Sequence, residues 1–287
     1  MLNYPFENNI NMLLLFFLAG LAAGWIIKDG VMDIIAGAGF QKQNYQGEKI
    51  PVGAGVLVLL GSIPVLTFSI FIFPVELKQK ATAFMFALSI YTCMGLMDDY
   101  WGSPVFRGIK GHLKSLLSGK PTTGSVKAIA GGLAALFVAI ISFNPGESLF
   151  LIVINTIIIA LSVNSINLLD LRPGRAGKAF LFWVFLIAAF FYNKYETIFA
   201  VVAAGVFLAY FPLDLKARAM MGDAGSNALG AVLGITSVWV LDLNYKLVLL
   251  TILLILHLIA EKDSITRLIE SNRLLSYLDR LGQNKIS

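Results

Sequence analysis

Runs of apolar residues separated by short polar segments dominate the chain up to about residue 261. Most runs are close to the ~20 residues that an α-helix needs to cross a bilayer. The pattern therefore predicts an all-α, polytopic integral membrane protein with about nine transmembrane helices. The predicted spans are residues 11–29, 50–73, 81–98, 125–143, 148–168, 177–192, 196–213, 225–242 and 245–261.

Composition agrees with a membrane protein. Of the 287 residues, 57% are apolar and 14% are charged, and the mean hydropathy of +0.79 is well above that of soluble globular chains. The single cysteine, Cys93, excludes an intramolecular disulfide. The first apolar run has no basic stretch before it and no convincing cleavage site after it, so we expect it to be the first span.

Basic residues fall unevenly on the two sides of this predicted topology. If the loops alternate sides, one side receives 18 Lys and Arg residues and the other receives 4. The positive-inside rule then places the N-terminus outside and the C-terminus in the cytoplasm. The net charge of +5 is spread over short loops, which suits anionic lipids and substrates, so we expect no nucleic-acid partner. With no soluble domain or repeat, residues 1–287 are predicted to form one membrane domain.

Two cytoplasmic segments are predicted to form amphipathic helices, at residues 108–119 and 264–282. In each, leucines fall on one helical face with basic residues elsewhere, as in helices that lie in a membrane interface. The first includes Lys114 and lies close in sequence to a carboxylate pair. A role in anchoring alone is the alternative for both.

Two polar clusters at cytoplasmic ends of predicted spans contain a lysine and a carboxylate pair. In "EKIPVGAG" (48–55), Lys49 could hold a phosphate, or could simply anchor the loop at the membrane surface. In "MDDYWG" (97–102), Asp98 and Asp99 end an apolar span. Adjacent carboxylates repel, so the pair suits a metal, a basic partner or general-base work, although it could also mark a membrane boundary.

A third cluster, "SVNSINLLDLRPGRAGK" (162–178), combines amides, a carboxylate and arginines. Asn164, Asn167 and Asp170 recur every third residue, and we expect them to project from neighbouring turns towards one side of a helix end. Arg172 and Arg175 could present two guanidinium groups to a diphosphate. The alternative for the arginines is a solvated loop.

The fourth cluster, "MGDAGSNALG" (221–230), begins a span with Asp223 between glycines, followed by Ser226. A helix N-terminus favours anions, and Asp223 could hold a cation that bridges to them; helix capping is the alternative. Together the four clusters offer carboxylates, amides and basic groups without a Cys or His cage. This combination predicts Mg²⁺-dependent handling of phosphates.

At these clusters the sequence resembles the polyprenyl-phosphate N-acetylhexosaminyl-1-phosphate transferases. The resemblance lies in "KIPVGAG", "MDDYWG", "NSINLLD" and "GDAGSNALG", in this order, and covers about residues 10 to 270. It implies Mg²⁺-dependent transfer of a sugar-1-phosphate from a nucleotide diphosphate-sugar to undecaprenyl phosphate in cell-envelope glycan synthesis. The site would face the cytoplasm in a bacterial plasma membrane. Membrane lipids are further expected partners, and a homodimer is allowed.

The resemblance also implies roles for individual residues. Asp223 would be the chief metal ligand and Asn167 a second one. Asp98 and Asp99 would position or deprotonate the lipid phosphate, and Asp170 would serve the nucleotide-sugar site. The expected substrate-binding residues are Lys49, Lys114, Asn164, Arg172, Arg175 and Ser226.

The sequence departs from the family in two places. Where the family continues its third motif as Asp-Gly-x-Asp-Gly, this chain has "DLRPG", and it lacks the family's His cluster because its histidines are His112 and His257. These departures leave a second hypothesis open, a membrane protein that binds the lipid or nucleotide-sugar, or regulates, without catalysis. A transporter has less support, since no span carries a charge near its middle.

Overall fold

The structure, a computed structural model, describes residues 10–44, 46–102, 122–144 and 146–283. Its elements in chain order are α1 (Ile10–Gly37), β1 (Gln41–Gln43), β2 (Lys49–Pro51), α2 (Val56–Ser69), α3 (Val75–Trp101), α5 (Thr123–Ile141), α6 (Phe150–Leu169), α7 (Arg175–Phe190), α8 (Thr197–Leu215), α9 (Gly222–Val240), α10 (Leu243–Lys262), α11 (Ile265–Ser271) and α12 (Arg273–Arg280).

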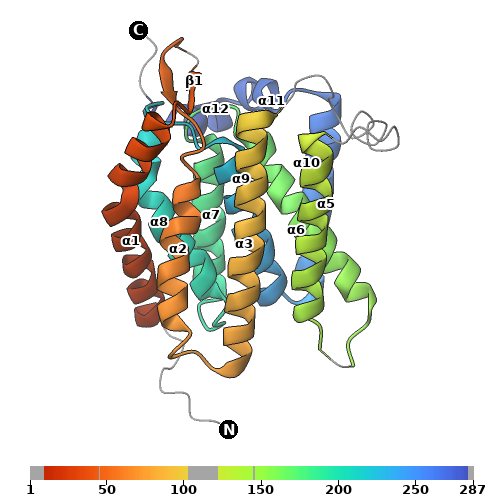
Figure 1. Cartoon of the computed structure of the whole chain (residues 1–287). Helices are drawn as coiled ribbons and strands as arrows, with labels where there is room; N and C mark the ends of the chain where they lie inside the picture. The colour runs from red at the N-terminus through yellow and green to blue at the C-terminus, as the bar shows by residue number, and fades with distance from the viewer. Residues whose placement is uncertain (1–9, 45, 103–121, 145, 284–287) are drawn as a thin grey trace.

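The long helices stand side by side, and the β-hairpin, α11 and α12 lie together at one end of the bundle (Figure 1). Each predicted apolar stretch contains a helix. Among the described residues, the helices long and apolar enough to cross a membrane are α1, α3, α5, α6, α8 and α10. The chain is therefore a mostly helical, multi-span membrane protein. The total of nine spans and their orientation stay predictions.

The second predicted span is wrong at its start. Residues 49–51 form strand β2, which pairs antiparallel with β1, and helix α2 begins only at Val56. Gly53 adopts a φ of +83°, a conformation that an α-helix excludes, so the chain turns before it enters the bundle. The apolar run is thus shared between a hairpin strand and a helix of 14 residues.

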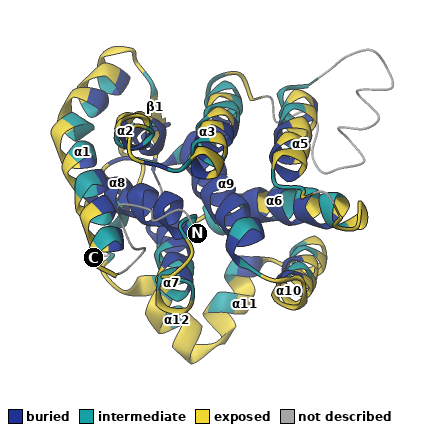
Figure 2. Cartoon of the chain, turned by 90° about the horizontal axis from the view of Figure 1, so that it is seen from below, coloured by how far each residue is buried: buried dark blue, intermediate teal, exposed yellow. Residues whose placement is uncertain are grey.

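The interior of the bundle is formed by α8 and α9, which are almost entirely buried (Figure 2). Glycine and alanine are frequent in both helices, and small residues let membrane helices approach closely. A Cβ at Gly20 of α1 would collide with the backbone of Val202 in α8. By contrast, α1 and α10 expose large apolar side chains such as Ile26 and Leu258, as lipid-facing helices do.

The C-terminal amphipathic helix expected over 264–282 is divided into α11 and α12. The division occurs at Asn272, whose Oδ1 accepts hydrogen bonds from the backbone N–H groups of Leu274 and Leu275 and so caps α12. The other predicted amphipathic helix, 108–119, lies outside the described residues.

Candidate active site

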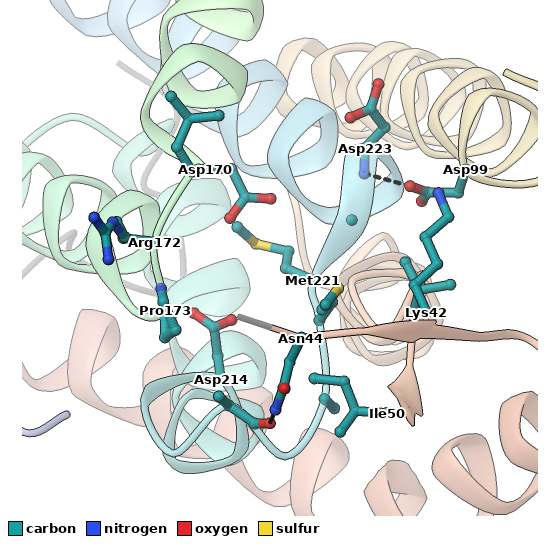
Figure 3. Close-up of a pocket in the computed structure, with 16 residues that line it drawn as sticks. Lys42, Asn44, Ile50, Asp99, Asp170, Arg172, Pro173, Asp214, Met221 and Asp223 are labelled. Atoms are coloured by element: carbon teal, nitrogen blue, oxygen red, sulfur yellow. Dashed lines mark hydrogen bonds between the residues drawn. The ribbon is translucent and has the colours of Figure 1, made fainter. Parts of the chain in front are cut away.

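A cavity of about 260 Å³ lies at the end of the bundle that carries the β-hairpin (Figure 3). Its lining comes from the hairpin, the end of α3, the turn after α6, the end of α8 and the start of α9. Each of the four polar clusters contributes to it, through Ile50, Asp99, Asp170 and Asp223 among others. Segments that are far apart in sequence therefore meet around one polar cavity.

Asp99 joins the end of α3 to the start of α9. Its carboxylate accepts hydrogen bonds from the backbone N–H groups of Asp223 (2.9 Å) and Ala224 (3.0 Å), which helix α9 leaves without internal partners. Gly222, at a φ of +70°, leaves room for this approach, because a Cβ there would press on the Asp99 carboxylate. Asp99 thus holds the helix N-terminus that carries Asp223.

Asp98 points to a different neighbour, although it is adjacent in sequence. Its Oδ1 accepts a hydrogen bond from Thr123 Oγ1 (2.8 Å), and its Oδ2 lies 3.3 Å from Lys127 Nζ. The same ammonium group lies 2.5 Å from Asp223 Oδ2. Consecutive residues project about 100° apart on a helix, so the carboxylate pair of the sequence serves two separate contacts.

Lys127 was not singled out from the sequence, where it counted only as one basic residue near a predicted boundary. Thr123 and Lys127 are four residues apart, which places both on the face of α5 that meets Asp98. An ionisable side chain just inside an apolar helix was the signal available. The positive charge of its ammonium group offsets the negative charges of the two carboxylates that it contacts, Asp98 and Asp223.

The hairpin brings Lys42, and not Lys49, to the cavity. Ile50 is buried and lines the cavity, and strand side chains alternate, so the adjacent Lys49 faces away and is exposed. Lys42 is the cross-strand partner of Ile50 and shares its face. Lys42 reaches towards Asp99 and interacts with its charge (Figure 3). The phosphate role expected for Lys49 therefore has a better candidate in Lys42.

The row of Asn164, Asn167 and Asp170 does not project into one site. Asn164 Nδ2 lies 2.9 Å from His257 Nε2 of α10, and Asn167 Nδ2 donates to Asn227 Oδ1 of α9 (3.2 Å). Of the three, only Asp170 lines the cavity. Side chains three residues apart on a helix point in directions about 60° apart. The directions of Asn164 and Asp170, six residues apart, therefore differ by about 120°.

Asp170 follows the last residue of α6 and faces other acidic side chains across the cavity (Figure 3). Burial raises the pKa of Asp170 well above its usual range, and the charges of Asp214, Asp223 and Asp99 raise it further. Asp214 was not identified from the sequence. It is buried at the end of α8, and its Oδ2 accepts a hydrogen bond from the backbone N–H of Gly174 (3.0 Å), which fixes the turn after Asp170.

The two arginines of the third cluster have different surroundings. Arg172 lines the cavity and lies 3.1 Å from Glu270 of α11. Arg175 is buried and turned towards the C-terminal helices, where its guanidinium donates two hydrogen bonds to Asp279 (2.7 and 2.8 Å) and one to Thr266 (2.9 Å). Arg175 does not line the cavity, and its three hydrogen bonds hold α11 and α12 against the bundle.

Replacing Asp279 by asparagine is expected to lower the free energy of unfolding by about 2–3 kcal/mol, because the buried Arg175 loses a charged, bidentate partner. Thermal unfolding in detergent measures the change. As a control, Asp263→Asn removes the exposed pair with Arg267 and should cost less than about 1 kcal/mol. Equal losses in the two variants would contradict the structural role of the Arg175 pair.

Ser226, another predicted substrate-binding residue, does not line the cavity. Ser226 is completely buried in α9, with its Oγ 3.5 Å from the backbone carbonyl oxygen of Asp223. Ser226 lies one helical turn after the start of α9 and is shielded from the cavity, so a role in packing is favoured. Lys114 lies outside the described residues.

The cavity and its neighbours suit a hydrated Mg²⁺ ion rather than a preformed metal cage. Among the described residues, no group of three or more acidic or histidine side chains converges on a metal position. The ligands on offer are carboxylate oxygens, and the position between Asp98 and Asp223 already stabilises the positive charge of Lys127. Mg²⁺ keeps several waters and usually takes only one or two carboxylates together with substrate phosphates. The residues present therefore fit this ion.

Comparisons with known proteins agree with a site for phosphates. The family model described as glycosyl transferase family 4 matches residues 81–241. A phospho-N-acetylmuramoyl-pentapeptide-transferase from Thermotoga neapolitana is 30% identical over 255 residues, covering 86% of this chain and 77% of that protein. One from Streptococcus pneumoniae (strain Hungary19A-6) is 25% identical over 202 residues, covering 68% of this chain and 61% of that protein. The chain therefore belongs to glycosyl transferase family 4, the polyprenyl-phosphate hexosamine-1-phosphate transferases, and is a phospho-sugar transferase.

Proposed function

We propose that the protein transfers a sugar-1-phosphate from a nucleotide diphosphate-sugar to undecaprenyl phosphate, with Mg²⁺, on the cytoplasmic face of the membrane. An oxygen of the lipid phosphate would bond to the phosphorus that carries the sugar, and the bond from this phosphorus to the nucleoside monophosphate would break. The carrying observation is the Asp98–Lys127–Asp223 contact beside a cavity lined by further carboxylates at the end of membrane helices. Positioning and charge neutralisation are what phosphoryl transfer requires.

The acceptor phosphate is proposed to bind near Asp98 and Lys127. The ammonium of Lys127 is 2.5 Å from Asp223 and 3.3 Å from Asp98, so a phosphate entering here would gain a cationic partner. Asp98 would orient the lipid phosphate or accept its proton. Asp99 would act mainly by holding the start of α9 through its two backbone hydrogen bonds.

Asp223 is proposed as the main Mg²⁺ ligand. Asn167 is a candidate second ligand, because its Nδ2 is used by Asn227 and its Oδ1 is the oxygen that remains. Bound Mg²⁺ would neutralise charge on the donor diphosphate. The high pKa of Asp170 means that this carboxyl keeps its proton more readily than an exposed one, so a cation nearby would favour its ionisation.

The donor is proposed to approach the cavity from the side of Asp170, Arg172 and Lys42. At about 260 Å³ the cavity is smaller than the ~300–1,000 Å³ typical of pockets that enclose whole ligands. Its size and polar lining therefore suit the charged diphosphate rather than the complete nucleotide-sugar.

Purified protein supplied with undecaprenyl phosphate, Mg²⁺ and a panel of nucleotide diphosphate-sugars is expected to release nucleoside monophosphate and form a lipid-linked sugar diphosphate. Chromatography of both products measures the reaction, and EDTA should stop it until excess Mg²⁺ is restored. No product from a broad donor panel would favour the alternative, a protein that binds lipid or nucleotide-sugar without transferring anything.

Replacing Lys127 by methionine is expected to reduce transfer about a hundredfold, because the phosphate loses a charged contact and Asp98 and Asp223 repel without the shared ammonium. Initial rates at varied lipid phosphate measure the loss. Lys262→Met, at the exposed end of α10, is the control and should keep nearly full activity. An unchanged rate in the Lys127 variant would remove this residue from the site.

A further inference from the structure

A second cavity, of about 410 Å³, lies at the opposite end of the helix bundle. Lys80 near the start of α3, Asn155 near the start of α6 and Asp242 just before α10 line it. The candidate active site instead uses the end of α3 and the residue after α6. The two cavities are therefore separated by the length of the same helices, and the proposed transfer reaction makes no use of the second one.

Two polar groups in this second cavity are buried without a complete set of partners. Asn155 is 3% exposed, and its Oδ1 has no hydrogen-bond partner among the described residues. Lys246 is 6% exposed; its ammonium group makes no side-chain hydrogen bond within the described part of the chain, although it interacts with the charges of Glu147 and Asp242. Buried polar groups are costly unless they are satisfied, so these two groups point to a polar ligand.

The charges around the cavity favour a ligand that carries both signs. Lys80 is neutralised by Glu196 at 2.5 Å, and the Glu147 carboxylate accepts hydrogen bonds from the backbone N–H and Nδ2 of Asn144 (3.1 and 3.2 Å). These bonds come from neutral groups and leave the charge of Glu147 in place, so the cavity keeps the cation of Lys246 and the anions of Glu147 and Asp242. The Asp242 side chain makes no capping bond to α10. Charges of both signs in one cavity complement a zwitterion.

The outer surface next to this cavity is apolar. Leu149, Phe150, Tyr245 and Val248 are all more than half exposed at the same helix ends. In a membrane protein such side chains contact lipid acyl chains and the interface. A zwitterionic ligand at this position is therefore expected to have an apolar part that lies against the bundle.

We propose that this cavity binds the headgroup of a phospholipid that carries a phosphate and a primary ammonium group. The Lys246 ammonium contacts the phosphate, and the Asp242 carboxylate and Asn155 Oδ1 accept hydrogen bonds from the lipid ammonium. Phosphatidylethanolamine has this chemistry. Phosphatidylcholine lacks ammonium N–H donors, and phosphatidylglycerol lacks the cation.

Native mass spectrometry of the whole protein, in equal mixtures of the three lipids, tests the proposal. Phosphatidylethanolamine is expected to be retained about tenfold more than either of the others, as a charge-assisted hydrogen bond implies. Competition with soluble phosphoethanolamine at millimolar concentration distinguishes a site for the free headgroup from a site for the whole lipid. If it displaces the lipid fully, the headgroup alone is recognised; if it does not, the acyl chains contribute. Equal retention of the three lipids would mean that the cavity holds water, and would overturn the proposal.

Variants locate the binding within the cavity. Lys246→Met and Asp242→Asn are each expected to abolish the preference for phosphatidylethanolamine, whereas Lys246→Arg keeps the charge and should preserve it. Lys194→Met is the matched control, since Lys194 is an exposed lysine in the loop before α8, outside the cavity lining. Thermal unfolding and transferase activity check that each variant is folded. A preference that survives both Lys246→Met and Asp242→Asn would contradict the assignment.

Discussion

Replacing Asp223 by asparagine is expected to lower the rate of phospho-sugar transfer about a thousandfold, since one carboxylate supplies both the proposed Mg²⁺ ligand and a partner of Lys127. Asparagine has the same shape, and Asp99 binds the backbone of residue 223 rather than its side chain. The start of α9 should therefore stay in place, and thermal stability should change little. Initial rates over a range of Mg²⁺ concentrations measure the effect, and higher Mg²⁺ should recover part of the loss.

Asp33→Asn is the control for this substitution. Asp33 is an exposed carboxylate near the end of α1 and does not line the cavity, so the variant should transfer at the normal rate. A variant of Asp223 that retains more than about a tenth of the rate would be inconsistent with direct metal binding by this residue.

Substituting alanine for Gly55 is expected to lower the free energy of unfolding by about 3 kcal/mol and to reduce transfer with it. A Cβ at this position would collide with the backbone of Gly225 in α9, and the Met221 carbonyl oxygen also lies within 3.0 Å of it. Backbone atoms cannot rotate aside as a side chain can. The start of α2 must therefore move away from α9, which also carries Asp223.

Thermal unfolding in detergent measures the cost of this change, and Gly30→Ala provides the matched comparison. Gly30 lies inside α1, and a Cβ there would have no neighbour within 4 Å. Because alanine favours a helix over glycine by about 1 kcal/mol, this control should be neutral or slightly stabilising. Similar behaviour of the two variants would contradict the close approach of α2 and α9.

Several residues of the site could be predicted from local sequence. Polar groups at the ends of apolar spans are costly, so their presence indicates a function. This reasoning identified Asp99, Asp170 and Asp223, which share a cavity. It failed where the direction of a side chain mattered. Lys42 takes the place expected for Lys49 because strand side chains alternate, and the prediction of one helical span over 50–73 contains no strand.

Other residues could be assigned only once distant elements were together in space. Arg175 looks like an anion-binding residue in sequence, yet its partner is Asp279, 104 residues away. Lys127 looks like a boundary lysine, yet it joins Asp98 to Asp223 across three helices. Neither pairing leaves a local pattern, since each depends on which helix faces are packed against one another.

The sequence by itself determined the family and the helical membrane architecture. It also predicted that the groups for phosphate chemistry gather at one end of the membrane helices. These follow from apolar run length, charge and short motifs, which act over a few residues. The tertiary structure decided which polar groups face the cavity and which are used in packing. It also decided that the Oδ1 atom of Asn155 is buried without a hydrogen-bond partner among the described residues. Both depend on helix rotation and on contacts between distant segments, and a periodic apolar pattern leaves these open.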